Sequence, residues 1–248
     1  MSDCKLEARQ TASASWTVTV DAGSPAALTA GDCYVGSGYS SGASLIANLQ
    51  AVLAAAVAST TVTLSATTGK ITITWGSGSH AMTWGSSVLR NRLGFTGSLA
   101  SATSHTSQGQ AQYLWIPGVN PGGMLSPITQ LGVIETDRRL GLARSGAVCV
   151  TQFNARRRQR WSFAGLLPAK TWEPSESTTN ESAESFWTDA VQGGAAIRYY
   201  TDKTSASSYL IGSTAMDYQA TADAFAPVRL RGDFDGLWVW AFEGRFTT

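Results

Sequence analysis

The sequence has little charge and few residues of the types that form metal sites or disulfides. Charged residues make up 14% of its 248 residues, against about 25% in ordinary soluble domains. The three cysteines, Cys4, Cys33 and Cys149, form no Cys-x-x-Cys motif and no cluster with either histidine. The pattern therefore predicts no zinc or other metal site, no cofactor, and thiols that stay reduced.

Long apolar runs and a leader sequence are also missing. The longest apolar stretch, residues 45–58, is interrupted by Asn48 and Gln50 and is too short to span a bilayer. The first ten residues are charged and do not contain the apolar segment of a signal peptide. We therefore expect no membrane insertion and a protein that folds in the cytoplasm.

The sequence holds no convincing set of catalytic residues. Residues 38–42 match Gly-x-Ser-x-Gly around Ser40, which is the pattern of a nucleophile elbow. That triad needs an acid and then a histidine after the serine, but no Asp or Glu lies between Ser40 and either His80 or His105. We expect His80 in a strand and His105 in a polar loop. Paired carboxylates of a glycoside hydrolase have no fixed spacing, but the acidic stretch 173–189 is better explained as a solvated loop. The sequence therefore predicts no catalytic residues and no enzyme.

What the chain has instead is glycine, serine, threonine and nine tryptophans. Few surface charges reduce solubility, and large aromatic residues concentrate at protein interfaces. This composition favours a self-assembling protein. The alternative is a β-rich monomer whose tryptophans fill its own core.

Hydrophobic periodicity predicts a mainly β fold. Alternating apolar residues indicate strands near 15–20, 61–65, 70–75, 80–84, 195–200 and 237–246, and the only long helical pattern covers 44–59. The predicted class is mainly β with one packed helix (α+β), as a β-sandwich or β-barrel module. We expect residues 1–14 to be an arm that a neighbouring subunit orders. The remaining chain divides into a β-rich half, 15–135, and a second β-rich half, 136–248, which share one core.

Basic and acidic residues lie in separate blocks. Residues 138–170 contain eight basic residues and no acid, whereas the charged residues of 173–189 are all acidic. We expect the arginine run at the tip or edge of a hairpin formed by 147–153 and 160–167. A neighbouring copy would then offer its acidic block to this run. The predicted interface residues are Arg156, Arg157, Arg158 and Arg160 on one subunit and Glu173, Glu176, Glu181 and Glu184 on the next. Alternatively, the arginines and Trp161 contact nucleic acid.

Residues 70–117 read as one structural unit. A strand at 70–75 precedes a Gly-Ser turn and a second strand at 80–84. A short helix, 88–93, follows with Ser86 or Ser87 as its cap and Gly94 at its end. A polar loop then leads to an apolar strand at 113–116.

This order of strand, short helix with Leu-Gly-Phe-Thr-Gly, polar loop and Tyr-Leu-Trp-x-Pro resembles a recurring module in tail proteins of long-tailed bacteriophages. The resemblance covers about a fifth of the chain. A second pattern, with Phe-Trp, a short helix, Gly-Gly, Arg-Tyr-Tyr-x-Asp and an aromatic closing strand, is similar to the end of β-sandwich domains in phage tail and distal-tail proteins. The residues of these packing motifs are Leu93, Gly94, Phe95, Tyr113, Trp115, Phe186, Trp187, Trp238 and Trp240.

The resemblance implies a structural virion protein: a tail-tube or distal-tail subunit that forms a ring around the DNA conduit. Its expected partners are copies of itself, other tail, baseplate or connector proteins, and genomic DNA through non-specific contact. Its expected location is the virion, after assembly in the host cytoplasm. Two alternatives stay open, a head-tail connector or capsid-associated protein and a carbohydrate- or receptor-binding module with exposed aromatic platforms; a hydrolase is the weakest reading.

Overall fold

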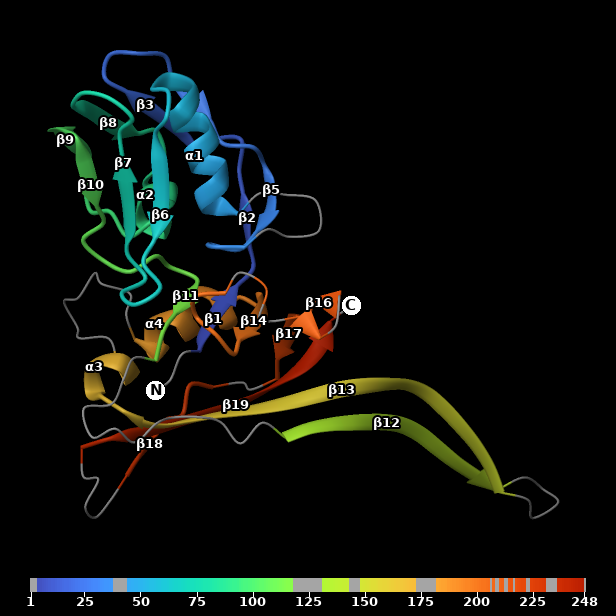
Figure 1. Ribbon diagram of the computed structural model, residues 1–248. Helices are drawn as coiled ribbons and strands as arrows, with labels where there is room; N and C mark the ends of the chain where they lie inside the picture. The colour runs from blue at the N-terminus through green and yellow to red at the C-terminus, as the bar shows by residue number, and fades with distance from the viewer. Residues whose placement is uncertain are drawn as a thin grey trace.

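The computed structural model describes residues 4–37, 44–117, 131–142, 148–172, 182–205, 207, 210–211, 214–215, 217–221, 224–230 and 236–247. The fold is mainly β with few helices, and every strand pairing among these residues is antiparallel. The predicted α+β, β-rich class is therefore confirmed. Figure 1 shows a lobe built around α1 above a large sheet from which two long strands extend.

The lobe around α1, here called the N-terminal lobe, contains two small sheets. The first has the order β4 (Ala26–Ala27), β3 (Thr17–Val20), β8 (His80–Trp84) and β9 (Leu99–Ala102), and the second has the order β10 (Ser104–Thr106), β7 (Ile71–Thr74) and β6 (Thr61–Leu64). A further pair joins β2 (Gln10–Ala12) to β5 (Gly31–Cys33). Buried residues of both sheets and of the helices α1 (Leu45–Ala56) and α2 (Ser87–Arg92) form one hydrophobic cluster.

Local sequence signals explain both helices. Helix α1 begins after Ser44, whose Oγ accepts a hydrogen bond from the Ala47 N–H, and it buries Leu45, Leu49 and Leu53 at helical spacing. Helix α2 is capped in the same way by Ser86. Gly94 follows α2 with φ of 77°, and a Cβ at this position would collide with the backbone of Gly109. Only glycine fits this close approach.

The polar segment after Phe95, predicted as a loop, instead contains strands β9 and β10. Strand β10 pairs with β7 so that Ser104 and Thr106 lie opposite Thr74 and Thr72. Threonine suits the pleated surface of a sheet even when the segment contains few apolar residues. His105 therefore lies on a strand and not in a loop.

The large sheet combines the start and the end of the chain. Its order is β11 (Leu114–Trp115), β1 (Lys5–Ala8), β14 (Ala196–Tyr200), β17 (Asp217–Ala220), β19 (Trp238–Thr247), β13 (Val148–Leu166) and β12 (Leu131–Leu142), and β18 (Val228–Arg229) also pairs with β19. The helical segments α4 (Ala183–Phe186) and η1 (Trp187–Val191) share a second hydrophobic cluster with this sheet, and α3 (Pro168–Thr171) follows β13. A separate two-stranded pair joins β15 (Leu210–Ile211) to β16 (Thr214–Ala215).

The predicted arm is wrong for the residues that the structure describes. Strand β1 lies between β11 and β14, and all four of its residues are buried. Strand β2 continues into the pair with β5. The segment is ordered within its own chain, because Leu6 and Ala8 point into the second cluster while its polar side chains find buried partners.

The predicted single core is replaced by two hydrophobic clusters. Leu114 and Ile116 belong to the cluster of the N-terminal lobe, whereas Trp115 between them belongs to the cluster of the large sheet. Alternation along β11 thus joins the two clusters at one short strand. The predicted division at residue 135 falls inside β12.

The aromatic residues of the packing motifs lie inside the subunit. Leu93, Phe95, Trp115, Phe186, Trp187 and Trp240 are buried, and Tyr113 and Trp238 are half-buried. None of the nine tryptophans is exposed. The high tryptophan content is therefore explained by the cores and gives no support to assembly.

Candidate functional site

The arginine run lies on a strand longer than the sequence suggested. Strand β13 continues for 19 residues from Val148 to Leu166, through the position at which a hairpin turn was expected. The hairpin partner of β13 is β12, so the predicted pairing of 147–153 with 160–167 is wrong. One signal was available: residues 150–164 contain no glycine or proline to start a turn.

Arg158 and Arg160 lie between two strands and not at a tip or an edge, whereas Arg156 and Arg157 pair with β12 alone among the described strands. Arg160 lies opposite Leu131 of β12 on one side and Glu243 of β19 on the other. Arg158 Nη1 is 3.5 Å from Glu243 Oε2, and these side chains are 34% and 39% exposed. Arg158 thus forms its ion pair with a glutamate of its own chain and not with the predicted acidic block of a neighbouring subunit.

The other predicted interface residues are only partly within the described structure. The side chains of Arg156 and Arg157 lie outside it, as do Glu173, Glu176 and Glu181. Glu184 is half-buried at the start of α4.

The outer parts of β12 and β13 form a two-stranded ribbon. The pairing of β13 with β19 ends at Arg158 opposite Arg245, so residues 148–157 pair with β12 alone. At about 3.3 Å per residue these ten residues extend roughly 30 Å. Figure 1 shows the ribbon projecting away from the rest of the chain. Among the described strands, none pairs with the outer edge of β12.

A group of buried polar side chains, here called the polar joint, connects the N-terminal lobe to the large sheet. Its members come from β1, from the segment after β5, from β14 and from β17. They are Lys5, Glu7, Tyr34, Ser37, Arg198, Tyr200 and Asp217, each at most 7% exposed.

The polar joint is neutral because its charges are paired. Glu7 Oε1 lies 3.0 Å from Lys5 Nζ, and Glu7 Oε2 accepts hydrogen bonds from Ser37 and Tyr200 at 3.2 and 3.1 Å. Arg198 donates from Nε to Asp217 Oδ1 at 2.5 Å and from Nη1 to Ser37 Oγ at 3.2 Å.

The aromatic members of the polar joint contribute in two ways. The Arg198 guanidinium lies 3.9 Å from the ring centre of Tyr34, which is a cation–π distance. Burial raises the pKa of Tyr34 and of Tyr200, so both phenols stay protonated at neutral pH. Sequence reasoning missed this site, because partners such as Glu7 and Tyr200 are far apart in the chain.

The second polar site joins Asp21 to His80 at the edge of the N-terminal lobe. His80 Nδ1 lies 2.7 Å from Asp21 Oδ2, and His80 Nε2 donates to the Ser77 carbonyl at 2.8 Å. Both ring nitrogens thus face acceptors, which favours the doubly protonated, positively charged ring. The hydrogen bond with Asp21 raises the pKa of His80, and the same bond lowers the pKa of Asp21. No carboxylate lies near His80 in the sequence, because Asp21 follows β3 and reaches His80 from a distant part of the chain.

The Asp21–His80 pair should make stability depend on pH. The raised His80 pKa stabilises the fold at pH values below 6.5, and this contribution is lost as pH rises through the folded pKa. The lowered Asp21 pKa contributes above pH 3.8 and is lost as pH falls further. His80→Gln should therefore reduce the melting temperature more at about pH 5 than at about pH 9. Asp21→Asn removes the same pair and should show the same pH course, and an equal loss at both pH values would contradict the assignment.

The other candidate groups form no metal-binding cluster within the described residues. No cluster of three His, Cys, Asp or Glu side chains occurs there. Ser40 and the rest of 38–43 lie outside the described residues. Cys4 and Cys33 are buried without a disulfide, and burial raises the pKa of Cys33 to about 11. None of the described helices has the length and apolar character needed to cross a membrane.

Comparisons with known proteins identify no relative. No family model, no curated protein and no solved structure matches the chain.

Proposed function

We propose that this chain is a structural virion protein: a subunit that forms a ring in the tail of a long-tailed bacteriophage, around the DNA conduit. Two independent observations support the proposal. The first is the resemblance of residues 70–117 to a tail-protein module. The second, which carries the proposal, is the projecting β12–β13 ribbon with its open edge.

Within the part of the chain that the structure describes, no strand covers the outer edge of the ribbon. A two-stranded hairpin without further packing is at best marginally stable in water. Strand β12 presents a row of backbone N–H and C=O groups that no described strand pairs with, and such an edge is a template for another strand. Copies related by a rotation can pair through the edges of their ribbons, which is a heterologous contact. Such contacts generate a closed ring when repeated rotation returns to the first copy.

The arginines of β13 would form a second, weaker contact between neighbouring copies in the ring. Arg160 is exposed, and Arg158 is held by Glu243 of its own chain. In a ring, the remaining arginines would meet the acidic segment 173–189 of the next copy. Contact with genomic DNA is the other role open to them. Other tail, baseplate or connector proteins would occupy the two faces of the ring, and this role requires no catalysis.

A carbohydrate- or receptor-binding module is less well supported. Such modules use exposed aromatic rings as sugar platforms, but no tryptophan of this chain is exposed. The two large hydrophobic residues that are exposed in the described structure are Val88 and Val228, and neither is aromatic. A ring subunit therefore remains the proposed function.

Shortening the ribbon tests the proposal. Residues 137–154 are replaced with Asn-Gly, so that a two-residue turn joins the paired residues Thr136 and Ala155. Residues 148–154 pair with β12 alone and lie outside the pairing of β13 with β19, so the variant should keep its melting temperature. We expect native mass spectrometry to find rings of the parent chain and monomers of the shortened chain.

A surface change in the other lobe serves as the control. Val88→Ser alters a side chain that is 48% exposed and lies far from β12 in the chain, and it should assemble as the parent does. Rings formed by the shortened chain would show that the ribbon is not the contact. A parent chain that stays monomeric at high concentration and binds glycans would overturn the proposed function.

A further inference from the structure

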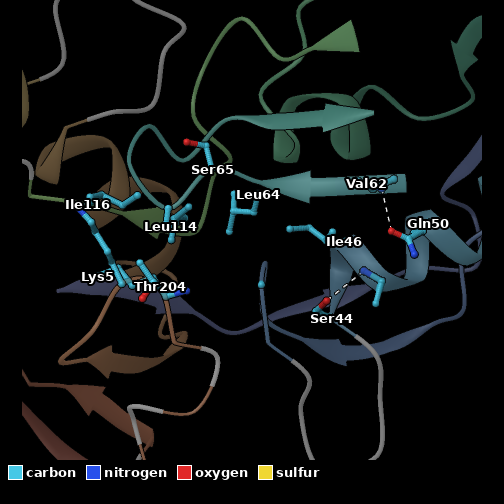
Figure 2. A pocket seen from close by; sticks show the side chains of 14 residues that line it. Lys5, Ser44, Ile46, Gln50, Val62, Leu64, Ser65, Leu114, Ile116 and Thr204 are labelled. Carbon is cyan, nitrogen blue, oxygen red and sulfur yellow. Dashed lines mark hydrogen bonds between the residues drawn. The ribbon is translucent and has the colours of Figure 1, made fainter. Parts of the chain in front are cut away.

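A pocket of about 320 Å³ lies between the N-terminal lobe and the large sheet. Helix α1 and the hairpin β6–β7 form one wall, and β1, β11 and the segment after β14 form the other (Figure 2). The pocket is lined by residues of these elements, among them Lys5, Ser44, Ala47, Ser65 and Lys203. Its volume lies at the lower end of the range of small-molecule sites, about 300–1,000 Å³.

The polar lining of the pocket is rich in donors and contains no acid. Two of its residues, Lys5 and Lys203, are cationic, and no Asp or Glu lines it. The hydroxyls of Ser44 and Ser65 accept backbone N–H bonds at 3.1 and 3.2 Å, so each keeps its O–H proton to donate. Such a lining favours an anionic ligand.

Lys5 is a positioned cation and not a mobile surface lysine. It is 6% exposed, and its Nζ is held 3.0 Å from Glu7 Oε1 and 4.4 Å from the ring centre of Tyr200. An ammonium group carries three N–H donors, so the ion pair with Glu7 leaves capacity for a ligand. Glu7 is fully buried and does not line the pocket.

Gly36 keeps the approach to this ion pair open. A Cβ at this position would lie 3.0 Å from Glu7 Oε1, 3.2 Å from Leu64 Cδ2 and 3.8 Å from Lys5 Nζ. Any larger residue would therefore fill the space between Lys5 and the apolar wall.

The N-terminus of α1 does not supply the anion site. The first N–H groups of the helix already have partners: Leu45 donates to Tyr34 O, Ile46 to Val35 O and Ala47 to Ser44 Oγ. Selectivity for an anion must therefore come from the lysines and hydroxyls.

Most of the remaining lining, apart from Gln50 and Thr204, is aliphatic. Ile46, Val62, Leu64, Leu114 and Ile116 contribute to it, and Figure 2 shows Lys5 and Thr204 near Leu114 and Ile116, across the pocket from Gln50. The ligand that fits has a negative group at the Lys5 end and an apolar body along this wall. We propose that the pocket binds a small carboxylate with a short aliphatic body. The site is separate from the ribbon, so this inference does not depend on the proposed ring.

Titration with hexanoate, followed by amide chemical shifts of the full chain, tests the site. We expect saturable binding with a dissociation constant on the order of 1 mM, since the ligand is small. Hexanol and hexylammonium share the aliphatic body but lack the negative charge, and they should bind at least tenfold more weakly. Lys203→Met should weaken hexanoate binding by about tenfold, because hydrogen bonds to charged groups contribute that much.

Two helix variants separate the pocket from the rest of the surface. Ala47→Trp fills the pocket from an exposed position of α1 and should abolish hexanoate binding. Ala55→Trp makes the same change two turns along the helix, at an exposed position outside the lining, and should leave binding intact. Equal binding of hexanol and hexanoate, binding that survives Ala47→Trp, or no saturable binding of hexanoate would each overturn the proposal.

Discussion

Asp217→Ala should destabilise the protein strongly, by about 3–5 kcal/mol, because it leaves Arg198 buried without its carboxylate. Arg198 is 3% exposed, and its Nε and Nη2 both donate to Asp217 at 2.5 and 3.4 Å. The guanidinium cannot lose its proton to escape the penalty. The free energy of unfolding, from urea titrations followed by tryptophan fluorescence, measures the effect.

Two comparisons identify the cause of this loss. The double variant Arg198→Met/Asp217→Leu removes both charges together and should recover most of the stability, since apolar residues often replace a buried ion pair without loss. Glu243→Ala breaks the half-exposed pair with Arg158 and should cost only about 0–1 kcal/mol. A loss below about 1 kcal/mol for Asp217→Ala would mean that water reaches the polar joint and solvates the Arg198 guanidinium.

Trp240→Ala should cost about 3–5 kcal/mol, as is typical for deleting a large buried aromatic side chain. Trp240 is 1% exposed and lies at the centre of the second hydrophobic cluster. Its ring is 5.1 Å from that of Trp115, 4.7 Å from that of Phe242 and 5.4 Å from that of Phe225. Deleting it would leave a cavity that rigid aromatic neighbours cannot fill.

The matched control for this change lies on the adjacent strand. Val228 of β18 pairs with Val239 and is 65% exposed, so Val228→Ala should change stability by no more than about 0.5 kcal/mol. Thermal and urea unfolding of both variants give the comparison. A Trp240→Ala protein as stable as Val228→Ala would show that Trp240 does not anchor the large sheet.

Elements with a strong local period were predictable from the sequence. Helix α1, the hairpin β6–β7 and strand β19 each repeat apolar residues at the spacing of their structure, and the structure confirms them. The capping serines and Gly94 were also predictable, because caps act within a few residues. Signals of this kind do not depend on the rest of the fold.

Elements whose burial depends on distant partners were not predictable. Strand β1 has only two apolar residues and becomes a central strand because β11 and β14 flank it. The arginine-rich centre of β13 is a strand because β12 pairs with all of it and β19 pairs with it from Arg158 onward. Strands β9 and β10 owe their form to pairing with β8 and β7.

The candidate sites depend even more on residues that are far apart in the sequence and meet only in the folded chain. Glu7 and Tyr200 meet across almost the whole chain, and Asp21 reaches His80 from another strand. Neither pair has a sequence spacing that would reveal it. The tryptophan count gives no support to assembly for a related reason, since it does not say which tryptophans are buried inside the subunit.

The position of β1 has a consequence for the order in which a newly made chain folds. The N-terminal lobe closes with residues up to Ile116, so it can fold while the ribosome is still adding the rest. Strand β1 pairs with β14, and Lys5 lies opposite Tyr200. Strand β14 pairs in turn with β17, and β17 pairs with β19 near the end of the chain. Strand β1 therefore cannot complete its pairing in the large sheet until almost all of the protein has been synthesised, although the N-terminal lobe has already folded. Until then the apolar side chains of Leu6 and Trp115 are exposed to solvent. The nascent chain is therefore vulnerable to misassembly until its last strand has been synthesised and has paired.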